Sequence, residues 1–94
     1  MNVSKPSIME RRIKWVYTHS VPIPEHLQSL LWDEQRYAPL EKLITRVLDY
    51  GNYDEIKYIY DTYPQETTDI TFRYPYIKRG IKFWIRYWNE HRNH

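Results

Sequence analysis

The chain has 94 residues, 41% of them hydrophobic and 28% charged, which is typical of one small folded domain and too short for two. It contains no cysteine, which excludes a disulfide framework, a thiolate metal site and a cysteine nucleophile. No charged-then-apolar leader opens the sequence, and its longest apolar runs are three residues. We therefore expect a cytoplasmic protein that does not span a membrane.

Charge is unevenly distributed, although the net charge is only +2. Residues 1–19 carry +3, residues 20–72 carry −6 and residues 73–94 carry +5. The basic ends can form a surface for phosphate or for an acidic protein. Alternatively, they neutralise the acidic middle within one fold. Both interpretations stay open on charge alone.

The first predicted helix covers residues 7–19, after residues 1–6, which we expect to be flexible. Ser7 and Glu10 have the spacing of a capping box, in which each residue satisfies a backbone N–H of the other. Apolar residues then recur on one helical face until Pro22 ends the pattern.

The middle of the chain contains the clearest helix, which begins after Pro39. Its apolar residues fall within an arc of about 140° on a helical wheel. Gly51 is expected to end this helix in the left-handed conformation. Upstream, Pro24 can open a short helix because proline is tolerated in a first turn, and residues 33–38 are expected to form a loop.

A third helix is predicted directly after this glycine. Asn52 and Glu55 have the spacing of a capping signal, so the two helices are expected to meet at a tight corner. Pro64 ends the third pattern. Residues 65–72 have a strand-like composition, but the stretch is too short to build a sheet and can form one more helical turn.

The last predicted helix follows Pro75 and has three distinct faces. One is apolar, one carries cations at four-residue steps, and aromatic residues project along the third. The outward side chains are the candidate binding residues: Tyr76, Lys78, Arg79, Lys82, Phe83, Arg86 and Tyr87.

The sequence predicts an all-α, compact single domain of four to six short helices, with residues 22–91 as its helical core. It shows no sustained period-two alternation, which strands with one buried face would require. The centres of the best apolar stripes should be mostly buried, namely Leu43, Val47, Ile56, Tyr60, Ile81, Trp84 and Trp88.

Patterns for cofactor chemistry are scarce. With only two glycines, the chain has neither a P-loop nor a dinucleotide-binding fingerprint. His91 and His94 are spaced as a metal pair could be, but no carboxylate cluster accompanies them, so we predict no metal and no other cofactor. The adjacent acids at 33–34 and 54–55 would point in different directions on a helix, unlike a general acid–base pair.

Arg86 and His91 enclose four residues, and this spacing resembles the Arg-(four to six residues)-His motif of HEPN domains. These are small all-helical ribonuclease toxins whose arginine and histidine act on RNA at a dimer interface. Arg12 and His19 have a permitted spacing as well, so the motif discriminates poorly. A HEPN-like ribonuclease is therefore the third functional hypothesis, and we expect a protein without enzymatic activity.

Nucleic-acid binding is the second hypothesis. The corner near Gly51 fits a helix-turn-helix, but Asp54 and Glu55 would place negative charge where a recognition helix meets DNA. The last helix is the better candidate, because its cations alternate with aromatic residues that can stack on bases. A merely solvated basic face is the alternative.

Three parts of the sequence carry a family resemblance: Leu30–Asp33, Leu43–Gly51 and Phe83-Trp84. They resemble a family of small uncharacterised prokaryotic domains with the pattern Phe-Trp-Asp, then Ile-x-Arg-Val-Leu-Glu-Tyr-Gly followed by an acid, and a Phe-Trp pair in the last helix. The likeness covers about residues 22–88. Genes of this family often lie beside those of nucleotidyltransferase-like toxins, so the resemblance implies an antitoxin or accessory role.

Within the resembling segments, Arg46, Asp49 and Tyr50 can also serve the helix corner structurally. The leading hypothesis is a small interaction module with a protein partner, which the resemblance suggests is such a toxin. The outer faces of the last helix would present the binding surface. A homodimer is compatible with this role.

Overall fold

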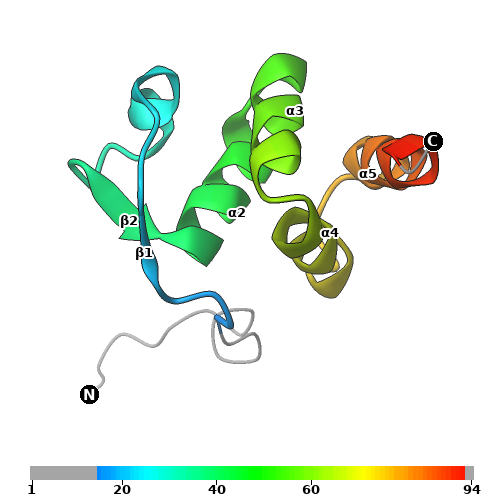
Figure 1. The fold of residues 1–94 in the computed structure, drawn as a ribbon, viewed down its shortest axis with the longest axis horizontal. Coiled ribbons are helices and arrows are strands. Elements are labelled where there is room, and N and C mark those ends of the chain that lie inside the picture. The colour runs from blue at the N-terminus through cyan, green and yellow to red at the C-terminus, as the bar shows by residue number, and fades with distance from the viewer. Residues whose placement is uncertain (1–14, 93–94) are drawn as a thin grey trace.

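Two three-residue strands precede the main helices in the computed structural model, which describes residues 15–92 (Figure 1). In chain order the elements are β1 (Ser20–Pro22), the 3-10 helix η1 (Glu25–Leu30), β2 (Tyr37–Pro39), α2 (Leu40–Tyr50), α3 (Tyr53–Thr62), α4 (Pro64–Arg73) and α5 (Arg79–Arg92). The predicted all-α class with four to six short helices is confirmed over this part of the chain. None of the helices described is long and apolar enough to cross a bilayer.

The N-terminal region differs from the prediction. Residues 1–6, and most of the helix expected at 7–19, lie outside the described residues. Residues 15–19 are irregular, so the end of that predicted helix is wrong. The chain instead continues into β1, which pairs antiparallel with β2. This sheet was not predicted, and β2 also replaces the end of the loop expected at 33–38.

Backbone pairing continues beyond the two strands into the start of α2. The Leu40 N–H donates to the His19 carbonyl at 2.9 Å, and the Glu41 N–H donates to the Tyr17 carbonyl at 2.9 Å. The first N–H groups of a helix have no partner within the helix, so the N-terminal segment satisfies two of them. It is thereby fixed against α2.

Glu41 strengthens this attachment through its side chain, which is fully buried. The carboxylate accepts hydrogen bonds from the N–H groups of Val16 (2.7 Å) and Tyr17 (3.1 Å), the guanidinium of Arg73 (2.8 and 3.2 Å) and the Tyr74 hydroxyl. Burial by itself raises the pKa of Glu41, but these hydrogen bonds outweigh burial and the pKa is lowered. The carboxylate therefore joins the N-terminal segment, α2 and α4.

The corner between α2 and α3 confirms one prediction and corrects another. Asn52 Oδ1 accepts from the Glu55 N–H at 2.8 Å, and Glu55 Oε1 accepts from the Asn52 N–H at 2.8 Å, so the capping box is present. Gly51, however, has φ −78° and is not left-handed. Glycine is favoured here by a close approach instead, because a Cβ would lie 2.6 Å from the Val47 carbonyl oxygen.

A full helix, α4, begins at Pro64, where the sequence predicted at most one helical turn. Pro64 does end the pattern of α3, but it also occupies the first turn of α4, where its missing N–H costs nothing. Thr67 and Thr71 are buried beside Ile70, and Thr67 Oγ1 donates to the Ile59 carbonyl at 3.4 Å. The β-branched residues that gave this segment its strand-like composition therefore form the buried face of a helix.

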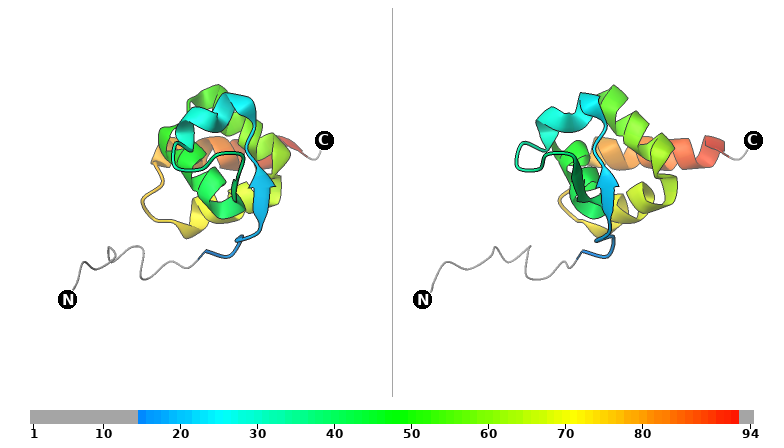
Figure 2. Two further views of the ribbon diagram at one scale, coloured as in Figure 1. Left: turned by 90° about the vertical axis from the view of Figure 1, so that its left-hand side faces the viewer. Right: turned by 60° about the vertical axis from the view of Figure 1, so that its left-hand side comes forward.

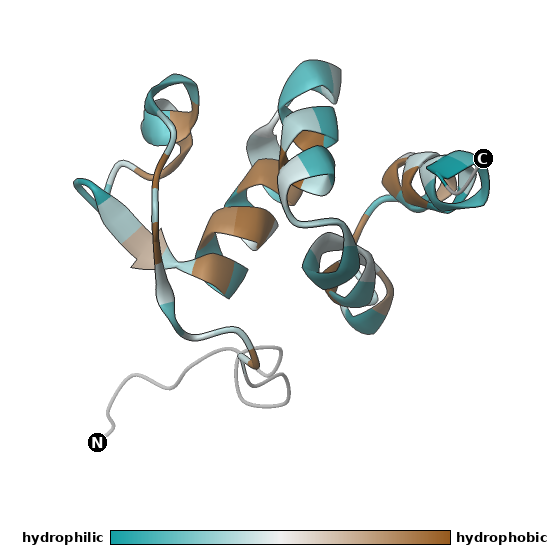
Figure 3. Cartoon of the chain, viewed as in Figure 1, coloured by the Kyte–Doolittle hydropathy of each residue, from teal (hydrophilic) through white to brown (hydrophobic). Residues whose placement is uncertain are grey.

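The hydrophobic core is centred on α2, whose buried turns are brown in Figure 3. Six residues expected in the core are buried: Leu43, Val47, Ile56, Tyr60, Ile81 and Trp88. Trp84 is only half-buried, which corrects the seventh, because it packs at the edge against the exposed Tyr53, with ring centroids 4.9 Å apart. Figure 2 shows α5 running behind α3 and α4 and extending beyond them.

Candidate docking surface

The outer face of α5 is the first candidate surface. Ile81, Ile85 and Trp88 are buried against the core. Successive residues are rotated by about 100° in a helix, so positions 79, 83, 86 and 87 fall on the opposite side. Their side chains are all exposed. We call this surface, made of Arg79, Phe83, Arg86 and Tyr87, the α5 outer face.

The aromatic rings on the α5 outer face are open to water. Phe83 is 60% exposed and Tyr87 49%, and their rings stack with centroids 6.2 Å apart and planes 23° apart. The Arg86 guanidinium lies 5.3 Å from the ring centroid of Phe72, an exposed residue of α4. Arginine side chains and aromatic rings therefore alternate along the surface that runs from Phe72 of α4 to the α5 outer face.

The remaining predicted binding residues lie beside this face. Lys82 is half-buried on the flank of α5. Tyr76 and Lys78 precede α5, so the expectation that they belong to the last helix is wrong. The Lys78 carbonyl accepts the Lys82 N–H at 3.1 Å, which places Lys78 where the helix begins.

The loop before α5 is anchored by the buried Ile77, while Tyr76 stays exposed. The rings of Tyr76 and Tyr74 pack edge to face, with centroids 5.4 Å apart. Partial desolvation and the nearby carboxylates of Asp49 and Glu41 raise the pKa of Tyr76, so its hydroxyl stays protonated at neutral pH. An open hollow of about 420 Å³ lies next to this loop, lined by Pro75, Ile77, Arg79 and Lys82.

Asn89 fixes α5 against the two preceding helices. The Tyr60 hydroxyl donates to Asn89 Oδ1 at 2.6 Å, and Asn89 Nδ2 donates to Thr68 Oγ1 at 3.1 Å. A hollow of about 410 Å³ lies beside these contacts, lined by Pro64, Gln65, Thr68, Asp69, Asn89 and Arg92. The contacts hold α5 as a fixed platform rather than a loosely attached helix.

Arg86 and His91, the ribonuclease-like pair, have different surroundings. Five positions along a helix correspond to a rotation of about 140°, and the Arg86 guanidinium lies near Phe72. The His91 ring lies 4.1 Å from that of Tyr87, and its Nδ1 lies 2.9 Å from the Tyr87 carbonyl oxygen. The two side chains therefore do not converge on one reaction centre within the chain.

Across residues 15–92, no group of three or more His, Asp or Glu side chains is arranged to hold a metal ion. His94 of the candidate pair lies outside the described residues.

A second exposed cluster lies where the chain after η1 meets α2. Trp32 is 68% exposed and Tyr50 is 64% exposed, with ring centroids 6.2 Å apart in an edge-to-face arrangement. The Arg46 guanidinium lies 4.3 Å from the Trp32 ring centroid. We call these three residues the Trp32 patch; the sequence did not identify them as a binding surface.

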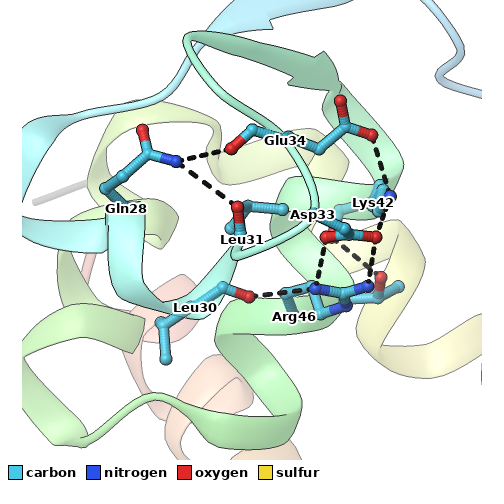
Figure 4. A network of polar contacts seen from close by, with 8 residues as sticks. Gln28, Leu30, Leu31, Asp33, Glu34, Lys42 and Arg46 are labelled. Carbon is cyan, nitrogen blue, oxygen red and sulfur yellow. Dashed lines mark hydrogen bonds and ion pairs between the residues drawn. The ribbon is translucent and has the colours of Figure 1, made fainter.

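Arg46, the cation of the Trp32 patch, belongs to a network of polar contacts that Figure 4 shows. Arg46 donates to both carboxylate oxygens of Asp33 at 3.1 Å and to the Leu30 carbonyl at 3.1 Å. Lys42 contacts Asp33 at 2.7 Å and Glu34 at 2.8 Å. Hydrogen bonds from Arg46 and then Lys42 hold the pKa of Asp33 well below its usual value, so Asp33 stays ionised.

Arg46 thus has structural contacts, but with Leu30 and Asp33 rather than with the corner at Gly51. The ring of Tyr50 faces solvent. Asp49 is also exposed. Partial desolvation raises the pKa of Asp49, while the charges of Lys78 and then Arg46 act in the opposite direction. Asp49 thus lies within the electrostatic reach of both Arg46 in the Trp32 patch and Lys78 near α5.

Comparison with known proteins adds no family assignment. No protein-family model matches this chain, and neither a curated protein nor a solved structure matches it significantly.

Proposed function

We propose that this chain is a small interaction module that docks a protein through the α5 outer face. The observation that carries the proposal is the exposed Phe83–Tyr87 pair, flanked by Arg79 and Arg86 on a helix whose opposite side is buried. Aromatic and arginine side chains often dominate the binding energy of protein interfaces, and aromatic rings bury large areas with few rotatable bonds. The two rings are thus suited to anchor a partner.

Charge specifies the kind of partner. Arg79, Arg86 and the flanking Lys82 are cationic, and Lys78 stands at the beginning of the helix. A partner with an acidic surface would associate faster and in a preferred orientation. The hollow bounded by Pro75 and Ile77 offers space beside the face for a side chain of that partner.

The family resemblance suggests a nucleotidyltransferase-like toxin as this partner. In that case the chain would be an antitoxin or accessory protein that acts by binding. The resemblance contributes the identity of the partner, whereas exposure and charge support only the docking role.

Nucleic-acid binding is a second candidate, favoured by the alternation of cations with exposed rings. Single-stranded nucleic acid can bind such a surface through phosphate contacts and base stacking. Its affinity would fall steeply with salt, because each phosphate contact releases counterions. A protein interface anchored by aromatic rings depends less on salt.

Two sets of substitutions separate these candidates. The first, Phe83→Ala with Tyr87→Ala, removes the rings; the second, Arg79→Gln, Lys82→Gln and Arg86→Gln, removes the charges. Tyr37→Ala is the matched control, since Tyr37 is also exposed but lies on β2. Each variant is used as bait in nuclease-treated lysate and titrated with labelled single-stranded RNA and duplex DNA.

For protein docking, the ring substitutions should reduce selective capture by at least about tenfold, and the charge substitutions should reduce it less. For nucleic-acid binding, the charge substitutions should reduce both the affinity and its dependence on salt. If the ring-deficient bait captures the same proteins in the same amounts as the parent, the α5 outer face is not the docking site.

A further inference from the structure

The Trp32 patch exposes two large rings that the proposed use of α5 does not require. Trp32 follows η1, and Tyr50 is the last residue of α2, so the rings come from different elements. Both remain more than three-fifths exposed although they contact one another. Large exposed apolar surfaces on small proteins commonly mark interaction sites.

The ring of Trp32 is held in place before any partner binds. Arg46 lies against it at 4.3 Å, and the guanidinium is fixed by Asp33 and the Leu30 carbonyl. A side chain that is already ordered loses little conformational entropy on binding. The contact with Arg46 therefore restricts the Trp32 ring before a partner binds.

Charge at the patch is balanced, in contrast to the α5 outer face. Arg46 and Lys42 contact Asp33 and Glu34, so two cations are paired with two carboxylates. The neighbouring Asp49 adds a third carboxylate, and the positive charge of Lys78 acts on it, so the balance is kept. A strongly acidic or strongly basic partner would gain no net attraction here.

We infer that the Trp32 patch docks a second copy of this chain, forming a two-fold symmetric dimer. Two-fold symmetry places the same surface of each copy face to face. The mixture of cations and carboxylates on one patch therefore meets the same mixture on the other copy. The patch of balanced charge tolerates this pairing, and the exposed rings of both copies are buried. The α5 outer face is less suited to this pairing, because two-fold symmetry would bring its arginines near those of the second copy.

The dimer leaves the α5 outer face available for another molecule and does not depend on the function proposed for that face. Few large side chains form the Trp32 patch, so the contact is smaller than a standard stable interface. Contacts of that size usually give weak association, with a dissociation constant on the order of micromolar.

The test measures the mass of the full-length chain in solution. Sedimentation equilibrium from about 1 μM to about 1 mM should show a reversible change from monomer to dimer. Trp32→Ala removes one ring, and Tyr50→Glu places added carboxylates near the two-fold axis. Each should raise the dissociation constant at least about tenfold, because such anchors dominate interfaces.

Arg46→Lys tests whether the ordered guanidinium matters, since it keeps the positive charge but loses the planar contact with Trp32. It should weaken the dimer less than Trp32→Ala. Tyr37→Ala and the Phe83→Ala/Tyr87→Ala variant are controls and should dimerise like the parent. Circular dichroism and melting temperature establish that each variant is folded.

A parent that stays monomeric over the whole range overturns the inference. The inference is also overturned if the folded Trp32→Ala and Tyr50→Glu variants dimerise as tightly as the parent. The same holds if only the substitutions on α5 disrupt the dimer. Because capture by α5 is measured separately, failure of the dimer is distinguishable from failure of the proposed docking function.

Discussion

At the scale of single residues, the two glycines occupy opposite environments. A Cβ at Gly51 would lie 2.6 Å from the Val47 carbonyl oxygen and 3.2 Å from Val47 Cγ1, whereas a Cβ at Gly80 meets nothing within 4 Å. Backbone cannot move away as a flexible side chain can. Position 51 therefore requires glycine for space, and position 80, at the beginning of α5, does not.

We expect Gly51→Ala to reduce the free energy of unfolding by about 1–3 kcal/mol through overpacking. Gly80→Ala should increase it by about 0.5–1 kcal/mol, because alanine restricts the unfolded chain and favours helix. Urea denaturation of both variants beside the parent measures the two effects. Equal changes in both would show that the close approach at Gly51 does not control the corner.

The sequence pattern predicted which side of α5 is exposed, but it did not predict that Trp32, Arg46 and Tyr50 come together. Spacing alone showed that Phe83 and Tyr87 lie away from the apolar stripe, and they do. The pairing of Arg46 with Asp33 spans 13 positions and joins separate elements, so no helical or strand period could reveal it. Only the family resemblance grouped these residues, and it did not indicate that Trp32 would be exposed.

At the scale of elements, prediction succeeded where local signals were complete. The stripe of α2 and the capping box of α3 each lie within a few consecutive residues. The strands β1 and β2 have three residues each and contain proline, so their composition gives no sustained alternation. Their pairing is a tertiary interaction. Pro64 ends the pattern of α3 as predicted, and the same proline also begins α4.

The orientation of α5 provides a prediction at this scale. Ile85 is fully buried, whereas Trp84 is half-buried and contacts Tyr53 and Trp88. Ile85→Ala should therefore cost about 2–5 kcal/mol, including the cavity that it leaves. Trp84→Ala should cost about 2 kcal/mol, because water already reaches part of its ring. Denaturant titration of both variants compares them; a larger loss for Trp84→Ala would mean that α5 is rotated differently.

At the scale of the whole molecule, the Glu41 carboxylate connects regions distant in sequence. It lies 24–25 positions from the backbone donors at Tyr17 and Val16, and 32 from Arg73. Sequence patterns placed Glu41 merely in the first turn of a helix, where acids are common. Its burial follows from the docking of the N-terminal segment across α2.

The Glu41 cluster makes stability depend on pH. Because the folded pKa of Glu41 is below the unfolded value of 4.5, its stabilisation is complete above pH 4.5 and is lost as pH falls through the folded pKa. Glu41→Gln should therefore reduce the free energy of unfolding by about 3 kcal/mol at pH 7, because the charge of Arg73 loses its buried partner.

Thermal unfolding from pH 7 to pH 2 tests this expectation. The difference between the parent and Glu41→Gln should be largest near neutral pH and shrink in acid, because protonation removes the same negative charge from the parent. Glu25→Gln, at an exposed position in η1, is the control and should follow the parent throughout. A difference that stays constant across the acid range would mean that the charge of Glu41 does not stabilise the fold. A difference that shrinks identifies its charge as what holds the N-terminal segment, α2 and α4 together.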